Sequence, residues 1–167
     1  MRQGFVKVAA ATPDIRVADV RYNTEKICEA IEAAADERAK IVVFPELCIT
    51  GYTCEDLFTQ EVLLREARAA LLEIAKFTAD KDILVFVGVP LSVDGELYNV
   101  VAALNRGEVL GLTTKTFLPN YGEFYEMRHF TPGPDSARRI MFEGNLVPFG
   151  PQLLFQATTM EELIVTA

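Results

Sequence analysis

Two runs of consecutive apolar residues, residues 41–44 (IVVF) and 83–90 (ILVFVGVP), constrain the fold of this chain most strongly. Strands that are apolar on both faces are typical of a sheet that is covered on both sides. Residues 5–11 predict a strand before them, and apolar residues recur at helical spacing in residues 23–40 and 55–81. The order strand, helix, strand, helix, strand predicts an α/β fold with helices packed against the sheet.

The alternation of predicted strands and helices stops after Pro90. Residues 98–104 and 108–117 predict two strands, and the intervening Asn-Arg-Gly at 105–107 predicts a tight hairpin, so the sheet should continue with antiparallel pairing. Residues 118–136 are irregular and rich in aromatic side chains, which favours a packed, functional loop. Three further short strands are predicted at residues 137–144, 151–157 and 162–167.

Composition excludes several classes of partner. The 16 basic and 24 acidic residues give a net charge of −8 without a Lys/Arg cluster, which argues against nucleic acid and anionic membranes as partners. No apolar segment approaches the length of a membrane span, and Lys7 interrupts the only short apolar run near the N-terminus. The 3 cysteines lack CxxC spacing, which predicts reduced thiols in the cytoplasm and no structural metal site.

Glu46 is the first candidate for chemistry. It follows an apolar strand directly, after Pro45, and open α/β sheets bind ligands beyond the carboxyl ends of their strands. A carboxylate in a partly apolar site there could act as a general base. Taken alone, the Pro-Glu pair is also compatible with a solvated glutamate at the end of a strand, because so short a motif is unspecific.

Lys115 lies near the end of the predicted strand 108–117 and could stabilise an oxyanion, although taken alone it would be interpreted as a structural edge-strand lysine that discourages aggregation. Tyr121, Glu123 and Glu126 follow closely and could form the wall of a pocket for a small polar substrate, or a surface loop held by aromatic packing. Cys48 lies between apolar neighbours and is interpreted as a packed residue. No glycine-rich phosphate loop is present, so no nucleotide-binding motif is found.

Two long stretches carry a resemblance to a known family. Residues 44–67 (FPELCITGYTCEDLFTQEVLLREA) and 115–133 (KTFLPNYGEFYEMRHFTPG) resemble the nitrilase, or carbon–nitrogen hydrolase, superfamily. Within it they are most similar to the glutaminase domains of the glutamine-dependent NAD(+) synthetases. The resemblance implies a nitrilase-type α/β/β/α sandwich, here incomplete at its C-terminus, and a Glu-Lys-Cys catalytic triad.

The resemblance also implies a role for individual residues. Glu46 would be the general base, Lys115 would stabilise the tetrahedral intermediate, and Tyr121 would contact bound glutamine. Tyr52 and Glu126 would line the same pocket. Either Glu123 or Glu126 would orient the lysine.

The family's catalytic cysteine would lie beyond Ala167, so we expect residues 1–167 to be the N-terminal part of a glutaminase domain and inactive alone. A C-terminal synthetase domain, absent from this chain, would use ATP, Mg²⁺ and deamido-NAD, whereas this chain itself would bind no cofactor and no metal. The resemblance also implies a homo-oligomer that acts on glutamine.

Two alternatives keep part of this interpretation. The chain could come from a stand-alone amidase, ureidase or nitrilase, in which no ATP-dependent domain follows the cysteine. It could also be a non-catalytic interaction subunit that supports oligomers of an active relative.

Overall fold

The structure, a computed structural model, describes residues 5–158 and 163–167. Its main element is a sheet in the strand order β1-β2-β3-β4-β5-β7-β6. The strands of this sheet are β1 (Val8–Ala10), β2 (Ile41–Val43), β3 (Leu84–Val93), β4 (Glu96–Asn105), β5 (Glu108–Thr114), β6 (Arg138–Phe142) and β7 (Asn145–Gly150).

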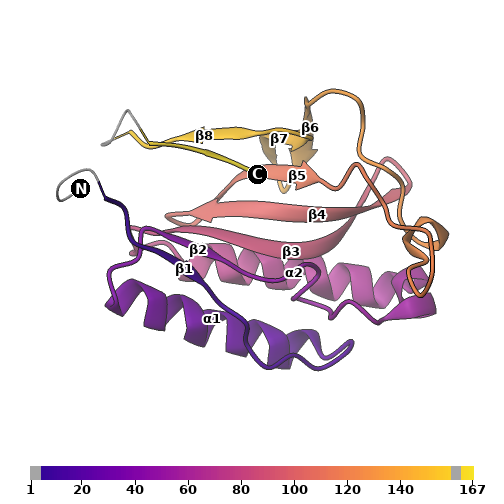
Figure 1. The fold of residues 1–167 in the computed structure, drawn as a ribbon, viewed down its shortest axis with the longest axis horizontal. Coiled ribbons are helices and arrows are strands. Elements are labelled where there is room, and N and C mark those ends of the chain that lie inside the picture. The colour runs from indigo at the N-terminus through magenta and orange to yellow at the C-terminus, as the bar shows by residue number, and fades with distance from the viewer. Residues whose placement is uncertain (1–4, 159–162) are drawn as a thin grey trace.

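Helices α1 (Val20–Asp36) and α2 (Glu61–Phe77) cover one face of the sheet, and the hairpin of β8 (Leu154–Gln156) and β9 (Ile164–Thr166) lies over the other face (Figure 1). The core between the helices and the sheet contains Ile31, Leu71 and Val87, which are fully buried. On the opposite face, Phe86 packs edge-on against Phe155 of β8. The α/β class that the sequence predicts is confirmed.

The strand pairing follows the predicted change after Pro90. Strands β1, β2 and β3 are parallel, as expected when helices connect them, whereas β3, β4 and β5 pair in antiparallel fashion. The turn between β4 and β5 places Arg106 at φ 49° and Gly107 at φ 88°. Two successive residues with positive φ are what a tight two-residue hairpin requires.

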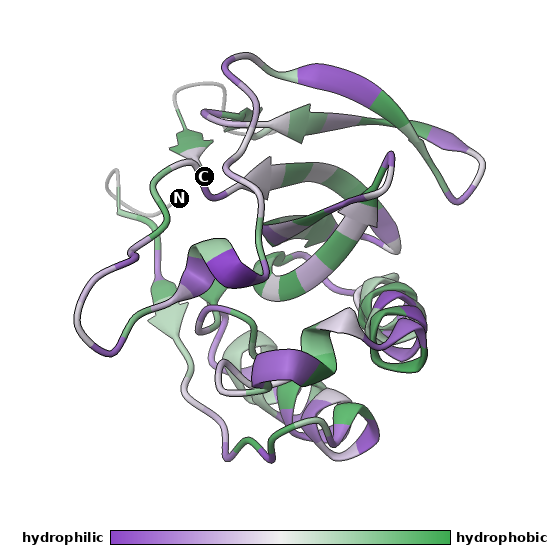
Figure 2. Ribbon diagram, turned by 90° about the vertical axis from the view of Figure 1, so that its right-hand side faces the viewer, coloured by the Kyte–Doolittle hydropathy of each residue, from purple (hydrophilic) through white to green (hydrophobic). Residues whose placement is uncertain are grey.

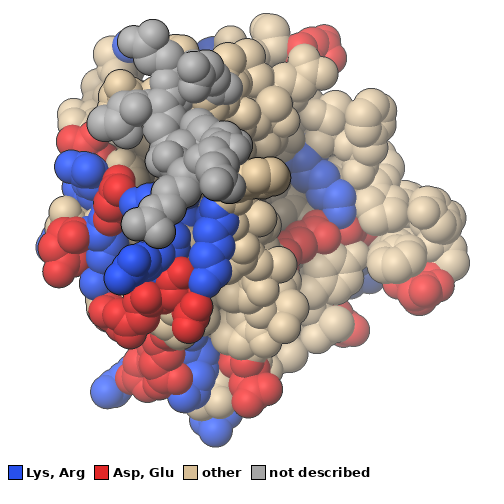
Figure 3. Space-filling model, turned by 60° about the vertical axis from the view of Figure 1, so that its left-hand side comes forward, with Lys and Arg blue, Asp and Glu red and all other residues tan. Residues whose placement is uncertain are grey.

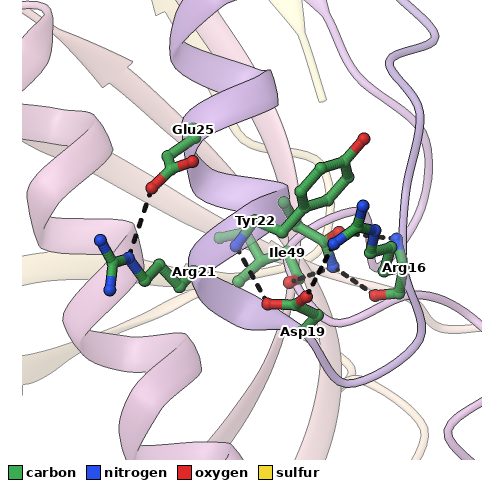
Figure 4. Close-up of polar contacts among 7 residues, drawn as sticks. Arg16, Asp19, Arg21, Tyr22, Glu25 and Ile49 are labelled. Carbon is green, nitrogen blue, oxygen red and sulfur yellow. Dashed lines mark hydrogen bonds and ion pairs between the residues drawn. The ribbon is translucent and has the colours of Figure 1, made fainter.

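Both helices differ from the predicted boundaries. Helix α1 begins at Val20, earlier than residue 23, because the carboxylate of Asp19 accepts the backbone N–H of Tyr22 and caps it (Figure 4). The predicted helix 55–81 is interrupted by the extended residue Gln60, which separates the 3-10 helix η1 (Glu55–Thr59) from α2.

The interruption at Gln60 changes which residues are buried. Leu57 and Val62 lie within the predicted helix but are exposed, whereas Ala67, Leu71 and Ile74 of α2 are buried. In Figure 2 both α-helices carry hydrophobic residues on one side and hydrophilic residues on another, as expected of helices that pack against a sheet with one face.

The C-terminal strands were predicted incompletely. Strand β7 was missed, because Pro148 and the glycines around residues 145–150 make that stretch look like a loop. In the structure β7 pairs with β6 and places Pro148 opposite Arg139. Strands β8 and β9 are shorter than the predicted strands 151–157 and 162–167, and residue 162 lies outside the described residues.

Acidic and basic side chains are mixed on the surface rather than separated. Figure 3 shows acidic and basic side chains side by side on one face. Among the ion pairs of the chain, Asp82 pairs with both Lys40 (2.5 Å) and Arg106 (3.4 Å). Within the described ranges, no helix has the length and hydrophobicity needed to cross a membrane.

The buried amide of Asn23 ties two loops of the sheet edge together. Its Nδ2 donates to the carbonyls of Arg16 (2.8 Å) and Ile49 (3.0 Å), and its Oδ1 accepts the N–H of Arg16 (2.8 Å). Figure 4 shows how Arg16 and Ile49 approach each other beside α1. The loop after β1 therefore stabilises the loop after β2, in which Glu46 lies.

Replacing Asn23 by leucine should lower the free energy of unfolding by about 3 kcal/mol, because it removes three hydrogen bonds to the backbone, one of them fully buried. Urea denaturation followed by circular dichroism would measure this loss. The control is Arg21→Ala on the same helix, where an exposed pair with Glu25 is lost and a change below about 0.5 kcal/mol is expected. If Asn23→Leu lost no more stability than the control, the hydrogen bonds of Asn23 would not be what holds the two loops together.

Candidate active site

Glu46 lies in a compact turn that follows β2 and crosses the middle of β3 at Gly88. The backbone N–H of Phe44 donates to the carbonyl of Phe86 (2.9 Å), and that of Ile49 donates to the carbonyl of Gly88 (3.3 Å). Leu47 is fully buried and adopts φ 52°, a conformation that non-glycine residues rarely take. Because the packing of the turn holds this backbone conformation, the Cα of Glu46 has a defined position above β3.

Gly88 makes this close approach possible. A Cβ atom added to Gly88 would lie 2.3 Å from the N of Leu47, 2.7 Å from the O of Pro45 and 2.9 Å from the C of Glu46. All three are backbone atoms, so no side-chain rotation could relieve the overlap. The residue at position 88 therefore determines where Glu46 sits.

Asn99 connects Glu46 with β5. Its neighbours Tyr98 and Val100 belong to the helix-side core, and alternate residues of a strand face opposite sides, so Asn99 points to the face away from the helices. There its Nδ2 donates to Oε1 of Glu46, while its backbone carbonyl accepts the N–H of Lys115 (2.9 Å).

Lys115 lies between two carboxylates. Its Nζ donates to Oε1 of Glu46 (2.7 Å) and to Oε1 of Glu126 (2.9 Å). Partial burial lowers the pKa of Lys115, but the hydrogen bonds and charges of the two glutamates more than offset this and raise the pKa above its ordinary value. The lysine is therefore a protonated, oriented cation at neutral pH.

Glu126 is the buried member of the group, with only 5% of its surface exposed. It begins the 3-10 helix η2 (Glu126–Arg128), and its Oε1 also accepts the hydroxyl of Tyr52 (2.7 Å). Burial, followed by the hydrogen bond to Glu126, raises the pKa of Tyr52, so that its hydroxyl remains a donor. Within the described part of the chain, Oε2 of Glu126 is buried and has no hydrogen-bond partner.

Two of the predicted site residues lie apart from this group. Tyr121 is 73% exposed and packs against Phe124 with ring centroids 6.0 Å apart. Glu123 is exposed and forms no hydrogen bond or ion pair with Lys115, so the carboxylate beside the lysine is that of Glu126. Glu123, Tyr52 and Glu126 do line a common cavity of about 290 Å³.

The three cysteines of the chain point elsewhere. The Sγ of Cys48 donates to the carbonyl of Gly88 (3.7 Å), and burial raises the pKa of this thiol to about 12. The Sγ of Cys54 donates to the carbonyl of Thr50 (3.1 Å), and burial raises its pKa as well. Cys28 lies on α1, and burial raises its pKa to about 11. None of them is paired with Glu46.

Sequence reasoning missed Asn99 and Gly88. A signal for Asn99 was present, since it is a polar amide inside the otherwise apolar strand YNVVAAL, and a buried amide needs hydrogen-bond partners. Gly88 carried the weaker signal of a glycine inside a strand, which often marks a close backbone approach.

Comparison with known proteins shows extensive similarity. A family model described as carbon–nitrogen hydrolase matches residues 7–159. A glutamine-dependent NAD(+) synthetase of Mycobacterium leprae (strain TN) is 36% identical over 163 residues, which are 98% of this chain and 24% of that protein. A protein of the same name from Aquifex aeolicus (strain VF5) is 40% identical over 141 residues, 84% of this chain and 24% of that protein. The chain thus spans about a quarter of the length of these relatives.

Solved structures share the fold. The crystal structure of a glutamine-dependent NAD(+) synthetase from Cytophaga hutchinsonii matches with a TM-score of 0.86 at 34% identity, covering 92% of this chain and 26% of that chain. An amidase from Nesterenkonia sp. matches with a TM-score of 0.68 at 24% identity, covering 89% of this chain and 56% of that chain. The predicted nitrilase-type fold is therefore confirmed.

Gly88→Ala should lower the free energy of unfolding by about 2 kcal/mol or more, because the new methyl group overlaps backbone that cannot move aside. Thermal and urea unfolding would measure the loss. The control is Gly111→Ala in β5, where the methyl group would meet side-chain atoms of Leu153 (2.9 Å) and Phe155 (3.0 Å) that can rearrange. Equal losses for the two variants would contradict the role assigned to Gly88.

Cys28 and Cys48 should resist alkylation in the folded protein. With pKa values of about 11 and about 12, fewer than about one thiol in a hundred is ionised at pH 8, and the thiolate is the reactive form. Iodoacetamide treatment at pH 8 with peptide mass spectrometry should find both unmodified in the native protein and modified in urea. Rapid native modification of Cys48 would show that it is a reactive thiol.

Proposed function

Because this chain belongs to the carbon–nitrogen hydrolase family, we propose that residues 1–167 form the N-terminal part of the glutaminase domain of a glutamine-dependent NAD(+) synthetase. The observation that carries the proposal is the lysine held between two carboxylates, Glu46 and Glu126. The 36–40% identity to glutamine-dependent NAD(+) synthetases supports this enzyme class over the amidases, which share 24% identity or less.

In the proposed reaction, Glu46 acts as the general base toward a cysteine thiol. The thiol transfers its proton to Glu46 as the sulfur attacks the carboxamide carbon of glutamine, and a tetrahedral intermediate forms. When the C–N bond breaks, the nitrogen takes the proton from Glu46 and leaves as ammonia, and a thioester remains. Glu46 then removes a proton from water, which attacks the thioester and releases glutamate and the thiol.

Lys115 provides the positive charge for the intermediate. An ammonium group has three N–H donors, and two of them are engaged by Glu46 and Glu126. The third is available to the oxyanion that develops on the carboxamide oxygen. Glu126, held by the hydroxyl of Tyr52, keeps the lysine oriented, and the exposed residues Tyr121 and Glu123 would contact glutamine.

The nucleophile is proposed to come from outside these residues. The thiols of Cys48 and Cys54 donate to backbone carbonyls, and that of Cys28 lies on α1, so none of them is available to Glu46. Residues 1–167 alone would then hydrolyse no glutamine.

The remaining parts of the proposal concern the whole protein. The ammonia would be used by a C-terminal synthetase domain that amidates deamido-NAD with ATP and Mg²⁺, in a cytoplasmic homo-oligomer. Among the described residues there is no cluster of three or more His, Cys, Asp or Glu side chains that could hold a metal ion. No step of the proposed glutamine hydrolysis passes through Mg²⁺ or ATP.

The test uses the full-length protein carrying Glu46→Gln. Glutamine hydrolysis, measured as glutamate release, should fall by at least about 1,000-fold, because the amide cannot take the thiol proton. NAD formation with added ammonia in place of glutamine should continue, since it bypasses the glutaminase step. The matched control is Glu73→Gln, an exposed glutamate on α2, which should retain full activity.

Two results would contradict the proposal. Glutamine hydrolysis that survives Glu46→Gln would remove Glu46 from the mechanism. Glu46-dependent turnover by residues 1–167 alone would show that a cysteine of this chain is the nucleophile.

A further inference from the structure

The two carboxylate oxygens of Glu46 have unequal surroundings. Oε1 accepts hydrogen bonds from Nδ2 of Asn99 and from Nζ of Lys115. Within residues 5–158 and 163–167, no donor contacts Oε2. One oxygen is therefore occupied by two donors, and the other is free to accept a proton.

Asn99 is held more rigidly than Lys115. Only 4% of its surface is exposed, it pairs with Pro90 of β3 on one side, and its carbonyl accepts the N–H of Lys115 on the other. Lys115 reaches Glu46 through a chain of four methylene groups, and its ammonium group is shared with Glu126. Asn99 reaches Glu46 through a short amide side chain on a central strand, which has fewer rotatable bonds.

The burial of the Asn99 amide in this strand is explained by its hydrogen bond. Asn99 is only 4% exposed, and a buried polar group is unfavourable unless it is hydrogen-bonded. The side-chain bond that Asn99 forms is the one to Glu46. The amide thus serves the carboxylate rather than the packing of the sheet.

We propose that Asn99 is a positioning residue: it holds Oε1 of Glu46 toward Lys115 and thereby leaves Oε2 as the oxygen that takes the proton from the nucleophile. This inference rests on the proposed function, because it assigns a task to a residue that acts through the general base. The structure supports it through the rigid placement of the amide and the unequal occupancy of the two oxygens.

The experiment measures glutamate release by the full-length protein carrying Asn99→Leu, which is close in size but donates no hydrogen bond. The turnover number should fall by about 30-fold or more, because the carboxylate loses its orientation, while KM for glutamine should change by less than about threefold. Asn99→Asp keeps the shape of the side chain but lacks the amide donor, and its turnover number should fall by the same factor. This second variant shows whether the effect of Asn99→Leu comes from a packing defect.

Asn105→Leu provides a matched control. Asn105 is an asparagine of the same strand, and its Nδ2 donates to the carbonyl of Ile83 (2.8 Å) at the other end of β4. Its replacement should lower the unfolding temperature and leave the turnover number within about twofold of the parent. An equal fall in turnover for Asn105→Leu would assign the effect of Asn99 to general loss of structure and overturn the inference.

A double-mutant cycle separates this inference from the proposed function. If Asn99 acts through Glu46, adding Asn99→Leu to Glu46→Gln should reduce the residual turnover by less than about twofold, read from overnight accumulation of glutamate. A further 30-fold loss in that background would overturn the positioning role and leave Glu46 as the base. Full activity of Glu46→Gln alone would instead overturn the proposed function, and the positioning role with it.

Discussion

The ion pair between Lys115 and the buried carboxylate of Glu126 is the interaction on which the arrangement of the site depends. A carboxylate that is 5% exposed is strongly unfavourable without a nearby cation, so the segment that carries Glu126 must fold back onto the end of β5. The same lysine contacts Glu46, and Tyr52 donates to Glu126. One cation thus brings together the turn after β2, the end of β5 and η2, which are far apart in the sequence.

The sheet supplies the rigid base that this network requires. Strand β3 is buried on both faces, and Gly88 within it lets the turn at residues 45–47 rest directly on its backbone. Asn23 secures the following residues by bonding to the carbonyl of Ile49. The general base proposed here is therefore positioned by backbone contacts on one side and by the amide of Asn99 on the other, and functional groups held by rigid elements keep their geometry best.

Much of the architecture could be predicted from local patterns. The apolar runs at residues 41–44 and 83–90 identified β2 and β3, and helical spacing identified α1 and α2. The misses have physical causes: Gln60 interrupts a pattern that looks continuous, and β7 contains a proline, a residue that argues against a strand. Neither effect can be read from periodicity, because each depends on what the neighbouring elements do.

For the site, the sequence by itself determined the chemical types and their order: a glutamate directly after a buried strand, a lysine at the end of another, and a loop of aromatic and acidic residues. Which acid of that loop meets the lysine was decided by the tertiary structure, since η2 buries Glu126 and leaves Glu123 exposed. Only the tertiary structure showed that Asn99 contacts Glu46, whereas the sequence already indicated that Cys48 is a packed residue. The physical reason is that hydrogen bonds and burial are set by distances in space, between residues 53 positions apart in the case of Asn99 and Glu46, whereas a motif records only neighbours along the chain.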